Sequence, residues 1–301
     1  MDNCCGTDTT NRLDKLKYHP CFSREAHHKF GRVHMPIAPA CNIQCRYCVR
    51  KYDCANESRP GVTSRVLSPL EAIDRLRAVA GRDQRITVIG VAGPGDPLAN
   101  PQTFEFLRMA RDEFPELHLC LSTNGLMLPD SLDELVEVGL ETLTVTINTI
   151  DPEVAGNIYS WVNYNGTTYR DTEATELLLK NQWEGLRDAV RAGMAVKVNT
   201  ILIPGVNDRE IPRVAEAAGA LGATIMNIMA LIPQAEFSHL VRPGIHELSR
   251  LRLECMPFLP MMTHCKQCRA DATGLMGEDK CMETETAMAR ISEDYLDMVA
   301  T

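Results

Sequence analysis

Short apolar runs alternate with amphipathic stretches along most of this chain. Six apolar runs are typical of strands, at residues 33–38, 85–91, 118–122, 142–147, 195–203 and 224–232. Stretches with helical spacing of apolar residues lie between them, at 68–80, 103–114, 131–138, 173–192 and 211–221. Strands that alternate with helices in this way predict a parallel sheet with helices outside it.

Right-handed crossovers between successive strands would curl this sheet. Six strands fall short of the eight of a full (β/α)8 barrel. We therefore expect an α/β fold, a partial (β/α)6 barrel with an open side, over residues 32–233. We also expect an N-terminal extension over 1–31 and a C-terminal extension over 234–301, with further helices at 244–256 and 283–299 and a polar insertion at 151–171.

The composition of the chain excludes several classes of function. The net charge of −9 argues against a nucleic-acid groove, and no apolar run is long enough to span a membrane. The first ten residues lack a signal-peptide pattern, so we expect a cytoplasmic protein with neither nucleic acid nor membrane as partner. In the cytosol, twelve cysteines are not expected to form disulfides. Their close spacings favour metal or cluster ligation.

Three cysteines directly follow the first predicted strand. Cys41, Cys45 and Cys48 have CxxxCxxC spacing within eight residues. Buried free thiols and a zinc site are the alternatives, but zinc sites favour CxxC pairs and four ligands. Thiolate is the ligand of iron–sulfur clusters. Three thiolates would leave one iron of a four-iron cluster open to a small molecule.

Other candidate residues lie at or near the carboxyl ends of the later strands, where ligands bind in such sheets. They are Gly93 to Asp96 after the second strand, Cys120 in the third, Thr146 and Asn148 at the end of the fourth, Asn199 and Ile201 in the fifth, and Ile228 in the sixth. Each alone is typical of a turn or a core position. Their common position at one rim predicts a ligand site.

A strand, the motif CxxxCxYC and a partial barrel together resemble the radical S-adenosylmethionine (SAM) enzymes, over about residues 32–233. The resemblance implies a [4Fe–4S] cluster on Cys41, Cys45 and Cys48 whose open iron chelates SAM, which is cleaved to a 5′-deoxyadenosyl radical. It also implies that Tyr47 lies near the adenine, that the loop from Gly93 through Gly95 to Asp96 binds the methionine end, and that the other rim residues contact SAM. Asp96 departs from the usual Gly-Gly-Glu wording of that loop.

The remaining cysteines offer further ligands. Cys265 and Cys268 form a CxxC pair, which alone is typical of zinc or redox sites and which could join Cys54 in a second three-ligand site. Cys21, His34 and Cys120 could make a third. Taken alone, His34 is more typical of a core imidazole and Cys120 of a small buried residue. No role is assigned to the remaining cysteines, Cys4, Cys5, Cys255 and Cys281.

Within the radical SAM enzymes, the chain is similar to the nitrogenase cofactor maturases. The similar segments are 19–21, 32–45, 53–62, 93–98, 121–125 and 265–272. The resemblance implies two auxiliary [4Fe–4S] clusters as substrates, one on Cys21, His34 and Cys120 and the other on Cys54, Cys265 and Cys268. It implies that one SAM donates a methyl group, that a second supplies the radical, and that the clusters fuse into an [8Fe–9S–C] precursor.

The same resemblance implies a cluster donor, an electron donor and a cofactor-accepting scaffold as partner proteins, and a form without the C-terminal carrier domain of longer relatives. Two other interpretations stay open. A radical SAM peptide or cofactor maturase with auxiliary clusters would not need His34 or Cys120. A non-catalytic iron–sulfur scaffold or electron carrier would leave the Gly93–Asp96 loop unexplained.

Overall fold

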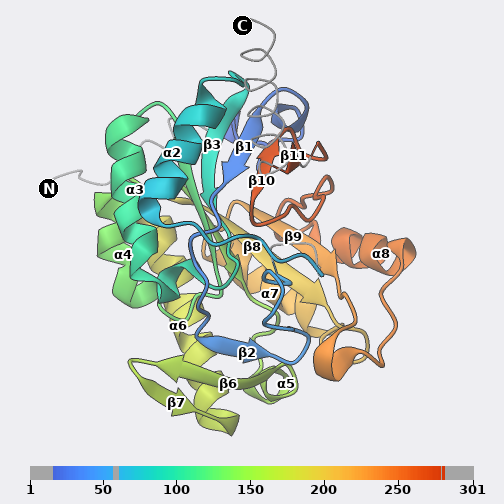
Figure 1. The fold of residues 1–301 in the computed structure, drawn as a ribbon. Helices are drawn as coiled ribbons and strands as arrows, with labels where there is room; N and C mark the ends of the chain where they lie inside the picture. The colour runs from blue at the N-terminus through green and yellow to red at the C-terminus, as the bar shows by residue number, and fades with distance from the viewer. Residues whose placement is uncertain (1–15, 57–60, 279, 282–301) are drawn as a thin grey trace, which may run out of the picture.

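The computed structural model describes residues 16–56, 61–278, 280 and 281. Its main sheet has the strand order β11-β10-β1-β3-β4-β5-β8-β9. The six consecutive strands from β1 to β9 in this order are parallel and confirm the predicted curled sheet (Figure 1). They are β1 (Gly31–His34), β3 (Ile86–Val91), β4 (His118–Thr123), β5 (Thr142–Thr146), β8 (Ala195–Leu202) and β9 (Ile225–Ala230).

Five long helices accompany these strands, close to the predicted bounds. They are α2 (Pro69–Ala80), α3 (Pro101–Glu113), α4 (Leu128–Glu137), α6 (Asp171–Arg191) and α7 (Glu210–Ala220). The start of α2 shows why the local sequence forms a helix there. The Ser68 hydroxyl accepts from the Glu71 backbone N–H at 3.3 Å, and the Glu71 carboxylate accepts from the Ser68 N–H at 2.8 Å. This capping box satisfies two backbone donors at the helix end.

Alternation along the strands separates the core from the barrel interior. Side chains on one face, such as Val33, Ile89 and Leu121, are fully buried in the main hydrophobic core with residues of the helices. The alternate residues of each strand face the barrel interior, because successive side chains of a strand point to opposite faces. Several of these inward residues are polar, and they line the site described below.

The first strand is shorter than predicted, since β1 ends at His34. Pro36 and Pro39 cannot donate a backbone hydrogen bond to a neighbouring strand. Residues 35–40 therefore continue as a loop, which meets the next strand's loop at a single bridge between Ala38 and Pro94.

The polar insertion contains structure that the sequence analysis did not predict. It forms α5 (Pro152–Gly156), β6 (Tyr159–Tyr164) and β7 (Thr167–Tyr169). These two strands make a second sheet with β2 (Ile43–Cys45), in the order β2-β6-β7 (Figure 1). A segment of the cysteine motif is therefore itself a strand, held from outside the main sheet.

The C-terminal extension returns to the start of the barrel. It contains α8 (Ile245–Cys255), β10 (Ala272–Gly274) and β11 (Lys280–Cys281), and β10 pairs antiparallel with β1. Short 3-10 helices occur at η1 (Ala26–His28), η2 (Pro97–Ala99) and η3 (Ala235–Phe237). The helix predicted at 283–299 lies outside the described residues. Within the described part of the chain, no helix has the length and apolarity needed to cross a membrane.

Candidate functional site

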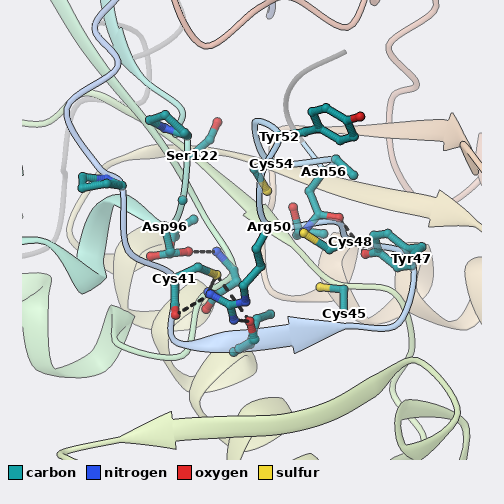
Figure 2. Close-up of a pocket in the computed structure, with 18 residues that line it drawn as sticks. Cys41, Cys45, Tyr47, Cys48, Arg50, Tyr52, Cys54, Asn56, Asp96 and Ser122 are labelled. Atoms are coloured by element: carbon teal, nitrogen blue, oxygen red, sulfur yellow. Dashed lines mark hydrogen bonds between the residues drawn. The ribbon is translucent and has the colours of Figure 1, made fainter. Parts of the chain in front are cut away.

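Two cavities lie at the interior of the barrel. The first has an empty volume of about 730 Å³, counting the part open to solvent, and is lined by Cys41, Cys45 and Cys48 (Figure 2). Residues 94–96 after β3 and 122–124 at the end of β4 line its other side. The structure therefore brings the three cysteines of the motif together with the predicted rim of the sheet.

Arg50 holds the loop that carries the cysteines. Its guanidinium donates to Gln44 Oε1 at 2.7 Å, to the Cys41 carbonyl at 3.0 Å and to the Ile43 carbonyl. The same guanidinium lies 4.9 Å from the ring centre of Trp161 on β6, a cation–π distance. The second sheet thus fixes the loop around β2 from outside the barrel.

Burial changes the pKa values of the thiols on this loop. Burial raises the pKa of Cys41 to about 12 and that of Cys45 well above its usual value, and it also raises the pKa of Cys48. Such thiols stay protonated unless a positive charge enters, and a bound metal deprotonates its thiol ligands. The nine cysteines whose side chains the structure describes are all free of disulfides.

The donor set fits a cluster. No three His, Cys, Asp or Glu side chains of the described residues converge in the way that a single metal ion requires. In a four-iron cluster each thiolate binds a different iron atom, so the ligands surround the cluster rather than meet at one point. Three thiols around one cavity, one of them buried and two half-buried, therefore suit a thiolate-ligated iron–sulfur cluster.

The loop after β3 approaches the cysteine loop closely. The Gly95 N–H donates to the Ala38 carbonyl at 2.5 Å, and the Asp96 N–H donates to the Ala40 carbonyl at 2.8 Å. A Cβ atom on Gly95 would lie 2.1 Å from the Ala40 carbonyl oxygen. Only glycine allows this approach, which places the loop against the residue that precedes Cys41.

Asp96 lines the first cavity and also ties its walls together. Its carboxylate accepts from the Thr123 hydroxyl at 3.0 Å, the Asn124 N–H at 2.6 Å and the Leu98 N–H at 3.0 Å. Burial raises the pKa of this carboxyl to about 6, although these donors oppose the shift. Asp96 therefore fixes the β3 loop against the end of β4.

A buried polar network stands behind the cysteine loop. The Tyr47 hydroxyl donates to Asn56 Oδ1 at 2.6 Å and accepts from Asn148 Nδ2 at 2.9 Å. Asn148 also donates to the Tyr159 hydroxyl at 3.0 Å and accepts from the Ile201 N–H at 2.8 Å. The ring of Tyr47, predicted to lie near the adenine, is thus held at its hydroxyl by Asn56 and Asn148.

The predicted SAM contacts divide between cavity walls and supporting positions. Tyr47, Gly95, Asp96 and Thr146 line the first cavity. Asn199 lines the second cavity instead. Gly93, Asn148, Ile201 and Ile228 line neither cavity. Arg50, Asn56 and Asn124 also line the first cavity and were not predicted from the sequence.

The second cavity occupies the inner face of the main sheet and has an empty volume of about 600 Å³. Its lining includes five of the proposed auxiliary ligands, Cys21, His34, Cys120, Cys265 and Cys268. Ser122 lines both cavities, so the two adjoin. Cys54 lines the first cavity, beside the motif cysteines (Figure 2). Cys265 and Cys268 line the same cavity as Cys21.

Strand register explains how His34 and Cys120 come together. Gly90 of β3 lies opposite His34 of β1 on one side and opposite Cys120 of β4 on the other. A Cβ atom on Gly90 would lie 2.7 Å from Cδ2 of the His34 ring. The glycine therefore makes room for an imidazole between the two strands.

The hydrogen bond of His34 selects a tautomer suited to metal binding. Its Nδ1 lies 3.1 Å from the Arg269 carbonyl oxygen. A carbonyl only accepts, so in the neutral ring Nδ1 carries the proton and Nε2 keeps its lone pair. Metal-binding histidines commonly donate their other ring N–H in this way.

Arg32, Lys197 and His19 also line the second cavity and were not predicted. The signal that could have found Arg32 and Lys197 is their position inside apolar strands. A lysine at the centre of the run Ala195–Leu202, flanked by two valines, must face a polar space or an anion if the strand is buried.

Comparison with known proteins defines the class of this fold and site. Residues 35–218 match the radical SAM superfamily, and the chain belongs to it. Membership implies a [4Fe–4S] cluster and SAM as its small-molecule partner.

Individual relatives of the chain define its place within this superfamily more closely. It is 49% identical over 277 residues to the FeMo cofactor biosynthesis protein NifB of Klebsiella pneumoniae, covering 90% of this chain and 59% of that protein. It is 45% identical to the NifB proteins of Chlorobaculum tepidum and Azotobacter vinelandii, covering 93% and 88% of this chain but 66% and 54% of theirs. The chain thus spans a little over half to about two thirds of the length of these relatives.

Among solved structures, the fold is similar to SuiB of Streptococcus suis. The TM-score is 0.56 at 14% identity, with 87% of this chain and 54% of that chain covered. The structure of SuiB bound to S-adenosylmethionine gives a TM-score of 0.51 at the same identity, with 87% and 52% covered. This similarity supports the partial barrel.

Proposed function

We propose that this protein is a radical SAM maturase that fuses two [4Fe–4S] clusters into the [8Fe–9S–C] precursor of the nitrogenase cofactor. Similarity to NifB supports the reaction class. The observation that carries the proposal is the second cavity, because its cysteines and histidine adjoin the cavity of the motif cysteines through Ser122. An enzyme that works on iron–sulfur clusters needs such a second set of donors within reach of its radical source.

In this proposal Cys41, Cys45 and Cys48 hold the resident cluster, which, with SAM bound, supplies the electron that cleaves SAM to a 5′-deoxyadenosyl radical. Tyr47 and Asp96 line the space next to it and position SAM. Thr146 and Gly95 complete the wall. Among the other rim residues, Asn148 acts through Tyr47, to which it donates a hydrogen bond.

The substrate clusters are assigned to Cys21, His34 and Cys120, and to Cys54, Cys265 and Cys268. Three ligands hold a cluster less firmly than four, which suits a substrate that must leave. His34 can bind metal only in its neutral form, so its hold on a cluster weakens at a pH where the imidazole is protonated. One SAM donates its methyl group to a cluster sulfide, and the 5′-deoxyadenosyl radical from a second SAM abstracts a hydrogen atom from that methyl group. The carbon gives up its remaining hydrogens as protons and enters the iron framework as carbide, while the two clusters fuse and gain one further sulfide. A cluster donor, an electron donor and an accepting scaffold protein are the partners that this reaction requires.

Replacing both Cys265 and Cys268 with alanine tests the second substrate site. SAM cleavage should stay detectable, because the first cavity keeps its three cysteines, while the carbide-bearing product is lost. Cys255→Ala is the matched control, since Cys255 is fully buried in the main core and lines neither cavity. Product at the control's yield from the double variant would show that the site is wrongly assigned.

His34→Ala tests the mixed site in the same way. Iron content or conversion of bound clusters should fall, whereas His239→Ala, which removes an exposed imidazole, should change neither. Unchanged iron and unchanged product in His34→Ala would restore the interpretation of His34 as a core histidine.

A further inference from the structure

The second cavity carries a charge opposite to that of the protein. The chain has 40 acidic residues and a net charge of −9. Among the described residues that line this cavity, none is an aspartate or a glutamate. Two are basic, Arg32 and Lys197, and they are only 1% and 7% exposed. A buried positive charge attracts an anion bound beside it more strongly than an exposed one does, so these two cations suit the cavity to an anionic ligand.

Arg32 brings its charge to a proposed ligand. One terminal nitrogen, Nη1, donates to the Gly274 and Leu275 carbonyls at 2.7 and 2.9 Å, which fixes the guanidinium against β10. The other, Nη2, donates to Cys268 Sγ at 3.0 Å. Arginine stays charged in proteins, so the guanidinium brings a positive charge into direct contact with this sulfur.

Lys197 brings a second charge from another strand. It faces Thr144 in the register of β5 and β8, and three strands separate β8 from β1 in the sheet order. Its Nζ lies 6.0 Å from the ring centre of Phe22, the residue next to Cys21. Lys197 therefore lies near the proposed ligand Cys21, whereas Arg32 contacts the proposed ligand Cys268.

We propose that Arg32 and Lys197 are the counter-ions of the second cavity, and that they select and retain an anionic thiolate-ligated iron–sulfur cluster there. This inference rests on the proposed function, and it adds two binding residues that are not ligands. Thiolate and sulfide ligands leave such a cluster with negative charge. Cations on two strands offset that charge without adding a bond to iron, so the cluster is stabilised and can still be released.

Substitutions of Lys197 test this proposal. The proteins are reconstituted anaerobically with Fe²⁺ and sulfide alone, and iron loss to a ferrous chelator is followed over time. Lys197→Met should release the iron of the second cavity about tenfold faster than wild type, since a buried charge pair a few ångströms apart contributes at least this much. Lys197→Arg should restore retention, because it keeps the charge. Lys180→Met removes an exposed lysine from α6 and should leave the rate unchanged.

The controls separate this proposal from the proposed function. SAM cleavage at the wild-type level in Lys197→Met shows that the barrel is folded, and Lys197→Gln is measured as well in case the methionine variant does not fold. If Cys268→Ala loses iron but both neutral Lys197 variants retain it like wild type, the counter-ion role is refuted and the proposed function stands. If wild type and Cys268→Ala bind equal iron, the substrate site itself is absent.

Discussion

The imidazole of His34 lies over Gly90, on the neighbouring strand, where a methyl group would come within 2.7 Å of the ring. On the far side of Gly90 stands Cys120, in direct register. The site therefore depends on a residue without a side chain as well as on its two proposed ligands. A glycine inside a strand often marks a place where another group approaches closely.

Gly90→Ala should therefore disturb the second cavity and spare the first. The added methyl group must displace the His34 ring, so reconstituted protein should lose up to about four iron atoms, the content of one such cluster. SAM cleavage should persist. Iron analysis and a cleavage assay check this, with Gly156→Ala as control, because a Cβ atom there meets nothing within 4 Å. Wild-type iron in Gly90→Ala would show that His34 does not bind a cluster.

At this scale, sequence could identify residues whose spacing is local. Cys41, Cys45 and Cys48 lie within eight residues, and one cavity does contain all three. Arg32 and Lys197 could not be assigned in advance, because their meaning depends on which strands face one another across the interior. The grouping of Cys54 with Cys265 and Cys268 stays a prediction, since the structure places Cys54 at the first cavity and the other two at the second.

At the scale of elements, the six parallel strands and their helices followed from hydrophobic periodicity. The sheet β2-β6-β7 did not, because β2 is only three residues long and pairs with residues more than a hundred positions away. A usable signal was present in the insertion. Asn165-Gly166 follows an aromatic-rich run, and both residues have positive φ, as hairpin turns of this kind require. The pair β10-β11 is equally short and left no periodic pattern.

Arg50 links this second sheet to the cysteine loop. The several hydrogen bonds of its planar guanidinium should therefore stabilise the loop more than its charge does. Arg50→Lys keeps the charge but cannot donate to Gln44, Cys41 and Ile43 together. We expect the first cluster to lose iron to a chelator about tenfold faster, the effect of one or two lost hydrogen bonds. Lys51→Met, which changes the adjacent exposed residue, should match wild type. Equal rates of iron loss in Arg50→Lys and wild type would show that the Arg50 guanidinium does not hold the cysteine loop.

The N-terminal cap of α2 should contribute to the stability of the protein and not to its activity. Ser68→Ala removes the hydroxyl that accepts from Glu71, and it should lower the free energy of unfolding by about 1 kcal/mol. Ser68→Thr keeps the acceptor and should recover most of the loss. Urea unfolding of the apoprotein measures both. A loss in Ser68→Thr as large as in Ser68→Ala would mean that the cap is not the cause.

At the scale of the whole molecule, segments far apart in sequence meet at one strand. Residues 19–21 and 265–268 both reach the cavity on the inner face of the sheet, and β10 extends that sheet beside β1. The division into two extensions and a barrel stays a prediction about the sequence. In the structure, the proposed ligands come from all three parts, so the cavity forms only when the extensions pack on the barrel.

The central claim is that one chain holds a radical-generating cluster in the first cavity and substrate clusters beside it. The most direct measurement is anaerobic reconstitution, followed by iron counting and a SAM cleavage assay, on wild type and on the triple variant Cys21→Ala, Cys265→Ala and Cys268→Ala. We predict about twelve iron atoms in wild type and about four in the variant, which should still cleave SAM. Equal iron in the two proteins, or about four in wild type, would contradict the claim.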